Sequence, residues 1–186
     1  MKRAGCYCVL GLIGLLAAVA SAAQAAGGQL PSGAQRAQER ITQEVRHELL
    51  SLPQFGIFDN LEFMVNGSTV TLMGEVRTAF LKDAAEKVVQ RVEGVEQVKN
   101  QIEVLPASAT DERIRLAVAR ALFDQDSPLL RYSMGAVPSL HIIVKNGRVT
   151  LEGVVASQTD KNLAFMRANG IHGVFSVENH LQVQKD

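Results

Sequence analysis

Residues 142–183, IIVKNGRVTLEGVVASQTDKNLAFMRANGIHGVFSVENHLQV, decide the fold of this chain. Apolar and polar residues alternate on both sides of residues 145–148, a spacing typical of two β-strands joined by a tight turn. A helical segment follows, and Gly173 and Val174 lead into a last alternating run. The stretch therefore predicts the order strand, turn, strand, helix, turn, strand.

The same pattern occurs once before, in residues 63–104, FMVNGSTVTLMGEVRTAFLKDAAEKVVQRVEGVEQVKNQIEV. A shift of 79 residues aligns the two stretches without a gap, and thirteen of the 42 aligned positions are then identical. This period is too long for a solenoid, whose units repeat every 20–50 residues or so. The sequence therefore predicts two copies of one small domain.

An amphipathic helix precedes each of these stretches. The first is predicted over residues 39–50, ERITQEVRHELL, and the second begins at Glu112, ERIRLAVARALF. These helices align with a shift of 73, so the second repeat carries six extra residues between its first helix and its first strand. One face of each helix is apolar at every fourth position: Ile41, Val45 and Leu49 in the first, and Ile114, Val118 and Leu122 in the second.

Both hairpins contain Asn-Gly, a strong hairpin signal because both residues tolerate a positive φ. Gly74 and Gly153 fall on the core-facing phase of the second strand, which indicates either the close approach of a helix or a bulge. Gly94 and Gly173 are predicted to end the crossing helices as left-handed caps.

Asn100 and Asn179 are polar residues on the inward-facing phase of the last strand of each repeat. They are either groups that bind a ligand or structural amides bonded to a neighbouring loop. Since buried polar groups are nearly always paired, the structural interpretation is favoured.

The composition is that of a globular protein: 47% of the 186 residues are hydrophobic and 20% are charged. Trp is absent, so the cores are expected to consist of Val, Leu, Ile and Ala. Nineteen basic residues balance nineteen acidic ones, which gives no support to nucleic-acid binding.

Residues 1–25 have the pattern of a cleaved secretory signal peptide, with Lys2 and Arg3 before a short apolar run and Ala23-Gln24-Ala25 as the cleavage site, or Ala20-Ser21-Ala22 as a second option. The alternative is an uncleaved anchor. Both cysteines lie in this segment, so the mature chain is expected to have no disulfide. The predicted organisation is a flexible N-terminus over residues 26–38, a first domain over 39–105, a linker over 106–111 and a second domain over 112–184. Within the linker, Thr110 or Asp111 is expected to cap the helix that follows.

The order helix, strand, strand, helix, strand resembles the BON domain, and two tandem copies behind a signal peptide resemble the OsmY-like and DolP-like envelope proteins of bacteria. The resemblance rests on V-T-L-x-G in the second strand and G-V-x-x-V-x-N before the third. The matching structural positions include Gly74, Gly94, Asn100, Gly153, Gly173 and Asn179.

This resemblance implies an α+β fold in which each domain is a three-stranded sheet covered by two helices. It also implies a periplasmic or membrane-associated location, binding to anionic phospholipid, and a part in envelope integrity or osmotic stress. The OsmY-like members add chaperone-like behaviour. The resemblance supplies no catalytic motif.

No phosphate-binding loop, nucleophile elbow or HExxH helix occurs in the sequence. The four histidines are not paired at a spacing typical of metal ligands on one helix. We therefore expect a protein that is not an enzyme and that has no cofactor and no metal site.

The longer connection in the second repeat, residues 124–140, combines apolar and aromatic residues with Arg131. Such a loop either enters a lipid headgroup layer or packs over the sheet or the other domain. A second difference lies on the crossing helix and just beyond it, where Phe165, Met166 and Phe175 replace Glu86, Lys87 and Glu96. These three residues predict a contact surface that the first repeat lacks.

The leading functional hypothesis is peripheral binding of anionic phospholipid through the second domain. The alternative is a soluble periplasmic protein that binds unfolded client proteins. The oligomeric state stays open. The candidate contact residues are Arg120, Leu130, Arg131, Tyr132, Met134, Lys145, Arg148, Phe165, Met166 and Phe175.

Overall fold

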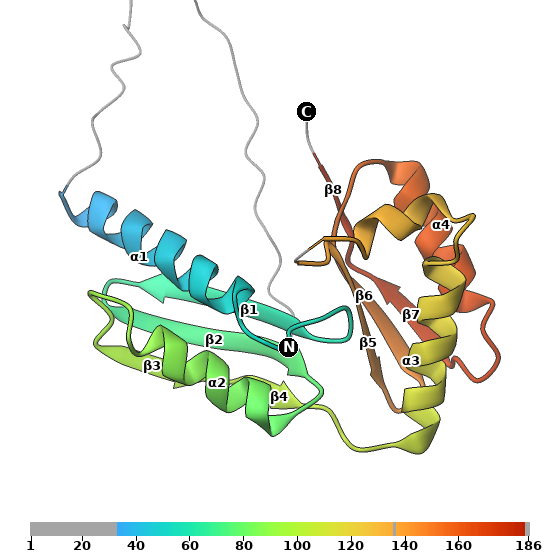
Figure 1. Ribbon diagram of the computed structural model, residues 1–186, viewed down its shortest axis with the longest axis horizontal. Coiled ribbons are helices and arrows are strands. Elements are labelled where there is room, and N and C mark those ends of the chain that lie inside the picture. The colour runs from blue at the N-terminus through green and yellow to red at the C-terminus, as the bar shows by residue number, and fades with distance from the viewer. Residues whose placement is uncertain (1–32, 136, 185–186) are drawn as a thin grey trace, which may run out of the picture. The chain divides into compact units, whose positions relative to one another are not determined.

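A computed structural model describes residues 33–135 and 137–184 and shows the predicted repeat (Figure 1). The proposed signal peptide and residues 26–32 lie outside the described residues. The first repeat consists of α1 (Gly33–Leu50), β1 (Asn60–Asn66), β2 (Thr69–Val76), α2 (Ala79–Val89), β3 (Gln97–Asn100) and β4 (Glu103–Val104). The second consists of α3 (Ala109–Leu122), a 3₁₀ turn η1 (Pro128–Tyr132), β5 (Leu140–Lys145), β6 (Arg148–Val155), α4 (Gln158–Asn169), β7 (Ser176–Asn179) and β8 (Gln182–Val183).

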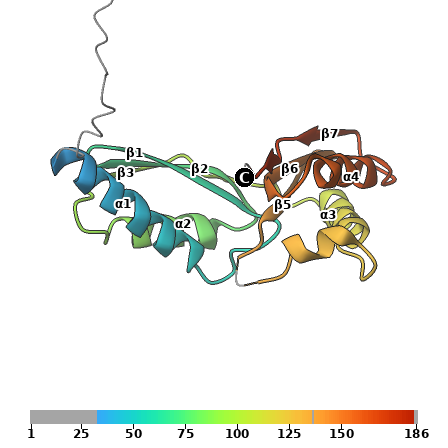
Figure 2. The same cartoon turned by 90° about the horizontal axis from the view of Figure 1, so that it is seen from above.

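Each repeat has one mixed sheet with the second strand at its centre. β1 pairs antiparallel with β2, and β3 and β4 pair parallel with the other side of β2. β5 to β8 repeat this arrangement around β6. The third strand position is thus broken into two short strands, and Figure 2 shows α1 and α2 on one face of the first sheet. The predicted α+β fold of two tandem domains is confirmed.

The cores form where the helical periodicity predicted them. Ile41, Val45 and Leu49 of α1 are buried against the first sheet. The matching face of α3 is buried in the second core, with Leu151 and Leu181 at its centre. Each core is built almost entirely of aliphatic side chains.

The first helix begins earlier than the sequence predicted. Residues 33–38, expected to be flexible, are helical. The side-chain amide of Gln38 donates through Nε2 to the Val65 carbonyl oxygen at 3.0 Å. The Thr42 hydroxyl donates to the Gln38 carbonyl oxygen at 2.8 Å. These bonds fix the first turns of α1 beside β1.

Helix α3 is capped by Ser108, not by Thr110 or Asp111. The Asp111 main-chain N–H donates to the Ser108 hydroxyl. The buried Asp111 carboxylate instead accepts the N–H groups of Asn146 and Gly147 at 2.9 and 2.8 Å, and so holds the second hairpin against α3. In this turn Asn146 and Gly147 both have positive φ, as predicted.

The glycines act through contacts that the sequence did not predict. A Cβ atom at Gly74 would collide with the carbonyl oxygen of Asn60 at the start of β1, and one at Gly153 with that of Ser139 just before β5, not with a helix. Gly94 and Gly173 have positive φ, but they lie beyond the helix caps Gln90 and Gly170. They therefore shape the turn before the last strand and are not helix caps.

The two inward-facing asparagines are structural amides. The Asn100 side chain donates to the Lys82 carbonyl oxygen of the crossing helix and accepts the Ile102 N–H. Asn179 makes the same pair of bonds, to Lys161 and Leu181. This confirms the structural interpretation, although the partner is the crossing helix and not a loop. Each amide spans the break in the third strand position.

The segment before β1 lies along β5 of the second repeat. The Ile142 N–H donates to the Ile57 carbonyl oxygen at 2.7 Å. The buried His141 ring donates through Nδ1 to the Gly56 carbonyl oxygen and stacks on Phe55 with 5.4 Å between ring centres. The first repeat thus supplies a turn, residues 56–59, that covers part of the edge of the second sheet.

This contact makes stability depend on pH. Burial lowers the pKa of His141, although hydrogen bonds to the Gly56 and Pro138 carbonyl groups oppose the shift. The unfolded chain therefore binds a proton near pH 6.5, where the folded chain does not. We expect the free energy of unfolding to fall as the pH drops from 7 toward 5.5. Urea denaturation at several pH values measures this dependence.

A His141→Gln variant is the control, because it keeps a donor for Gly56 but cannot be protonated. Burial also raises the pKa of Asp59, whose protonation favours the folded state at lower pH. Comparing the two proteins at each pH removes that contribution. A wild-type curve parallel to that of the variant would contradict the prediction.

Candidate functional site

The extra residues of the second repeat pack on their own domain. Ser127 caps η1, and Leu129 is fully buried in the second core. Tyr132 is also buried, with 7% of its surface exposed. Its ring is therefore not available as a surface contact, contrary to the role that we expected for it.

A hydrogen-bond network anchors this loop to the start of α4. The Tyr132 hydroxyl donates to the Asp160 carboxylate and accepts the Ala156 N–H, both at 2.8 Å. The Ser157 hydroxyl and the Arg131 guanidinium donate to the same carboxylate oxygen. Burial opposes ionisation of Asp160, but the donors Ser157, Tyr132 and Arg131 outweigh it and hold the pKa below its usual value.

The other loop candidates differ in exposure. Arg131 is exposed, but it lies over the Tyr132 ring and forms an ion pair with Asp160 at 2.7 Å. Its charge is therefore largely neutralised within the domain. Leu130 is half-buried. Met134 is exposed over 66% of its surface. Of the loop residues, Met134 is the one most open to an apolar partner.

The most exposed large apolar side chain of the described residues lies beside the tip of the second hairpin, in the turn before β7. Phe175 is 78% exposed, and its main-chain N–H donates to the Gly147 carbonyl oxygen at 2.8 Å. The Arg148 guanidinium carbon lies 5.8 Å from the centre of the Phe175 ring, within range of a cation–π contact. A shallow hollow of about 590 Å³ adjoins them, lined by Lys145, Asn146, Arg148, Thr150, Phe175 and Glu178.

The charges around this tip are unequal. Lys145 is paired with Glu103 at 2.6 Å. Glu178 adds a negative charge to the hollow. Among the described residues, none forms an ion pair with Arg148, so of the two cations at this tip it is the more available to an anionic ligand. We call Arg148 and Phe175 the hairpin-tip pair.

The remaining candidates lie on helices. Phe165 and Met166 are exposed on α4, over 39% and 62% of their surfaces. Arg120 is exposed on α3. No contact joins these side chains to the hairpin-tip pair, so the structure does not unite the ten candidates into one surface.

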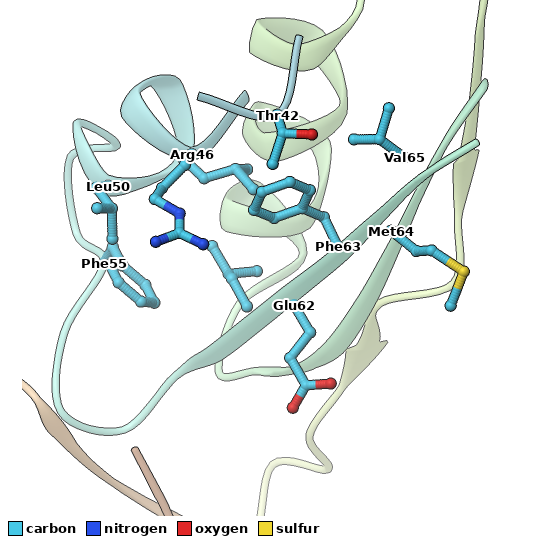
Figure 3. A pocket seen from close by; sticks show the side chains of 10 residues that line it. Thr42, Arg46, Leu50, Phe55, Glu62, Phe63, Met64 and Val65 are labelled. Atoms are coloured by element: carbon cyan, nitrogen blue, oxygen red, sulfur yellow. The ribbon is translucent and has the colours of Figure 1, made fainter. Parts of the chain in front are cut away.

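Sequence reasoning missed a groove in the first repeat. It lies between α1 and β1, has a volume of about 640 Å³, and is mostly apolar (Figure 3). Figure 3 shows the Phe63 side chain beside Thr42 and Arg46, while Glu62 points away from α1. The signal available in the sequence was the pair Thr42 and Arg115, which stand at matching positions of the two helices but differ greatly in size.

The described residues show no metal centre and no membrane-spanning helix. No three His, Cys, Asp or Glu side chains in this part of the chain gather closely enough to hold a metal ion. Each helix within it is too short or too polar to cross a bilayer.

The comparisons with known proteins agree with the repeat. A family model described as the BON domain matches residues 37–106 and 110–185. No curated protein matches the chain. Among solved structures, the chain is similar to CdsD, a structural protein of the type III secretion system of Chlamydia trachomatis, at 13% identity, with 77% of this chain and 92% of that chain covered and a TM-score of 0.30.

The C-terminal domain of CdsD gives 12% identity, 77% and 96% coverage, and a TM-score of 0.27. Likenesses of this size carry no argument about function. The two family matches, by contrast, together span most of the chain and each begins within the first helix of a repeat. The protein therefore belongs to the BON-domain family and carries two BON domains in tandem.

Proposed function

We propose that this protein is an exported, non-enzymatic envelope protein that binds anionic phospholipid at a membrane surface through its second domain. The observation that carries the proposal is the hairpin-tip pair, an exposed aromatic ring with a cation beside it. BON domains are linked to phospholipid binding and to osmotic-stress proteins. The family is generally non-enzymatic and occurs in periplasmic or envelope proteins.

The pair suits the boundary between lipid headgroups and acyl chains. An aromatic ring gains by leaving water there, and a cation near an anionic surface contributes on the order of 1 kcal/mol. Lys145 adds less because Glu103 neutralises it, and Glu178 opposes binding. We therefore expect a modest affinity that falls with added salt.

Binding of unfolded clients is the alternative. It would use exposed apolar side chains without a preference for charge, and Met134 and Met166 are the residues suited to it. The cation beside Phe175 favours the lipid proposal, because client capture gives no reason for that pairing.

Liposome flotation tests the lipid proposal. The purified protein should float with vesicles that contain anionic lipid at low salt, and not with neutral vesicles. The double variant Phe175→Glu with Arg148→Thr introduces the residues that the first repeat holds at Glu96 and Thr69, so the fold should be preserved. We expect it to bind roughly tenfold or more weakly, from the lost ring and the lost charge.

Phe80→Thr is the matched control. Phe80 is exposed in the first repeat, and Thr159 stands at the matching position of the second. Its flotation should equal that of the wild type. Equal flotation of the double variant, or flotation that ignores lipid charge, would reject the hairpin-tip pair as the lipid contact.

A further inference from the structure

The outer edge of β1 carries unpaired main-chain groups. Asn66 and Thr69 close the first hairpin, so alternate residues counted back from Asn66 bond to β2. The intervening residues Leu61, Phe63 and Val65 then direct their N–H and C=O groups away from β2. Of these groups, the Val65 carbonyl receives the Gln38 side chain, and no other bond from the described residues reaches this edge.

The equivalent edge of the second domain is closed in two ways. The turn before β1 covers part of it, with the Ile142 N–H donating to the Ile57 carbonyl oxygen. The guanidinium of Arg115, a residue that is 4% exposed, donates to the Val144 carbonyl oxygen at 2.9 Å. Ile142 and Val144 correspond to Phe63 and Val65. The same sheet edge is therefore covered in one domain and open in the other.

One substitution accounts for much of the difference. Thr42 stands on α1 where Arg115 stands on α3. The shorter Thr42 leaves the groove of about 640 Å³ between α1 and β1. This groove is lined by Leu49, Leu50, Phe55, Leu61 and Phe63 as well as by Arg46.

The groove also carries a charge without a partner. Arg46 is exposed at the groove, and none of the described residues forms an ion pair or a hydrogen bond with it. Figure 3 shows its side chain on the same side of β1 as Phe63. An apolar floor, an open strand edge and a free cation thus occur together.

We propose that the groove binds an extended polypeptide segment of a partner protein, which adds to β1 as a further strand. Main-chain bonds to Phe63 supply the pairing, apolar side chains fill the groove, and an acidic group of the segment meets Arg46. The occupied edge of the second domain is the precedent, because there the Ile57 carbonyl oxygen, in the turn before β1, already accepts the N–H of the matching strand. This site is separate from the hairpin-tip pair, so either proposal can fail alone.

The probe is a peptide with the sequence FGIFDN, residues 55–60, the segment that covers the equivalent edge in this protein. It contains apolar residues and an acidic one. Titration into ¹⁵N-labelled protein should shift the main-chain amide signals of Leu61, Phe63 and Val65. A peptide N-methylated at its isoleucine lacks a main-chain donor and should produce smaller shifts.

Thr42→Arg is the decisive variant, because it transplants the residue that closes the edge of the second domain. The second domain shows that this position accepts arginine, and an unchanged melting temperature confirms folding. We expect at least a roughly tenfold loss of peptide affinity. Arg46→Ala should weaken binding by a smaller factor that disappears at high salt. Phe80→Thr, on α2 and away from the residues that line the groove, should bind as the wild type does.

Three results would overturn the proposal. The first is equal peptide binding by folded Thr42→Arg, and the second is no amide shift with peptide at about 1 mM. The third is concentration-dependent self-association that Thr42→Arg abolishes, seen by sedimentation, because the occupant would then be a second copy of this chain. Selective shifts at the β1 amides that Thr42→Arg removes would support it.

Discussion

Replacing Gly153 by alanine is expected to unfold the second domain or to leave it barely stable. Gly153 has φ +117°, which side chains with a Cβ atom rarely adopt. The added Cβ would also collide with the Ser139 carbonyl oxygen, which belongs to the main chain and cannot move alone. That oxygen accepts the Val154 N–H at 2.8 Å, so shifting it loses a further hydrogen bond. We expect a loss of about 3 kcal/mol or more.

Urea denaturation followed by circular dichroism measures this loss. Gly56→Ala is the control, since no atom lies within 4 Å of a Cβ built there and its φ is not positive. It should change the free energy of unfolding by no more than about 0.5 kcal/mol. Gly74→Ala should destabilise the first domain by a similar amount to Gly153→Ala, because Asn60 approaches Gly74 in the same way. A mild effect at Gly153 would mean that the strand can relax around a methyl group.

The sequence was most informative where a pattern occurred twice. The apolar faces of α1 and α3 were predicted because periodicity depends only on spacing along one helix. The structural role of the Asn100 and Asn179 side chains was predicted because an amide that faces the core needs hydrogen-bond partners within its own domain. Both inferences use rules that hold whatever the neighbouring element is.

Features that depend on distant partners were not predicted. The glycines of the second strands were assigned to a helix or a bulge, but the atom that excludes a side chain is a main-chain oxygen of the preceding segment. Tyr132 was expected at the surface because the sequence does not show that Asp160, 28 residues away, would bond to its hydroxyl. The start of α1 was placed too late because Gln38 is fixed by Val65, a residue of β1.

The candidate site was predicted in part. Comparing the repeats drew attention to Phe175, which is exposed beside Arg148. The same comparison could have paired Thr42 with Arg115, but the meaning of that difference depends on the distance from the helix to the strand edge. Met64 and Phe80, which are exposed in the first repeat, were not singled out from the sequence.

Replacing Asp160 by leucine is the second change with a large expected effect. The first domain has the buried Leu81 at this position, so leucine suits the start of the crossing helix. In the second domain, however, the Asp160 carboxylate accepts bonds from Tyr132, Ser157 and Arg131. Leucine would leave the buried Tyr132 hydroxyl without an acceptor and release the loop that holds Leu129. We expect a loss of about 2–4 kcal/mol.

A double-mutant cycle separates the network from simple packing. Tyr132→Phe alone should cost about 1–2 kcal/mol, because it also leaves the Ala156 N–H unpaired. If the hydroxyl and the carboxylate stabilise one another, the double variant should be more stable than the sum of the single losses by about 1–2 kcal/mol. The cycle should be measured at pH 7. Because the pKa of Asp160 is lower in the folded protein than in the unfolded chain, the carboxylate contributes fully to stability above the unfolded-state pKa. This contribution is lost as the pH falls through the folded-state pKa. Additive losses would show that the longer loop is held by Leu129 alone, and that Asp160 serves only the start of α4.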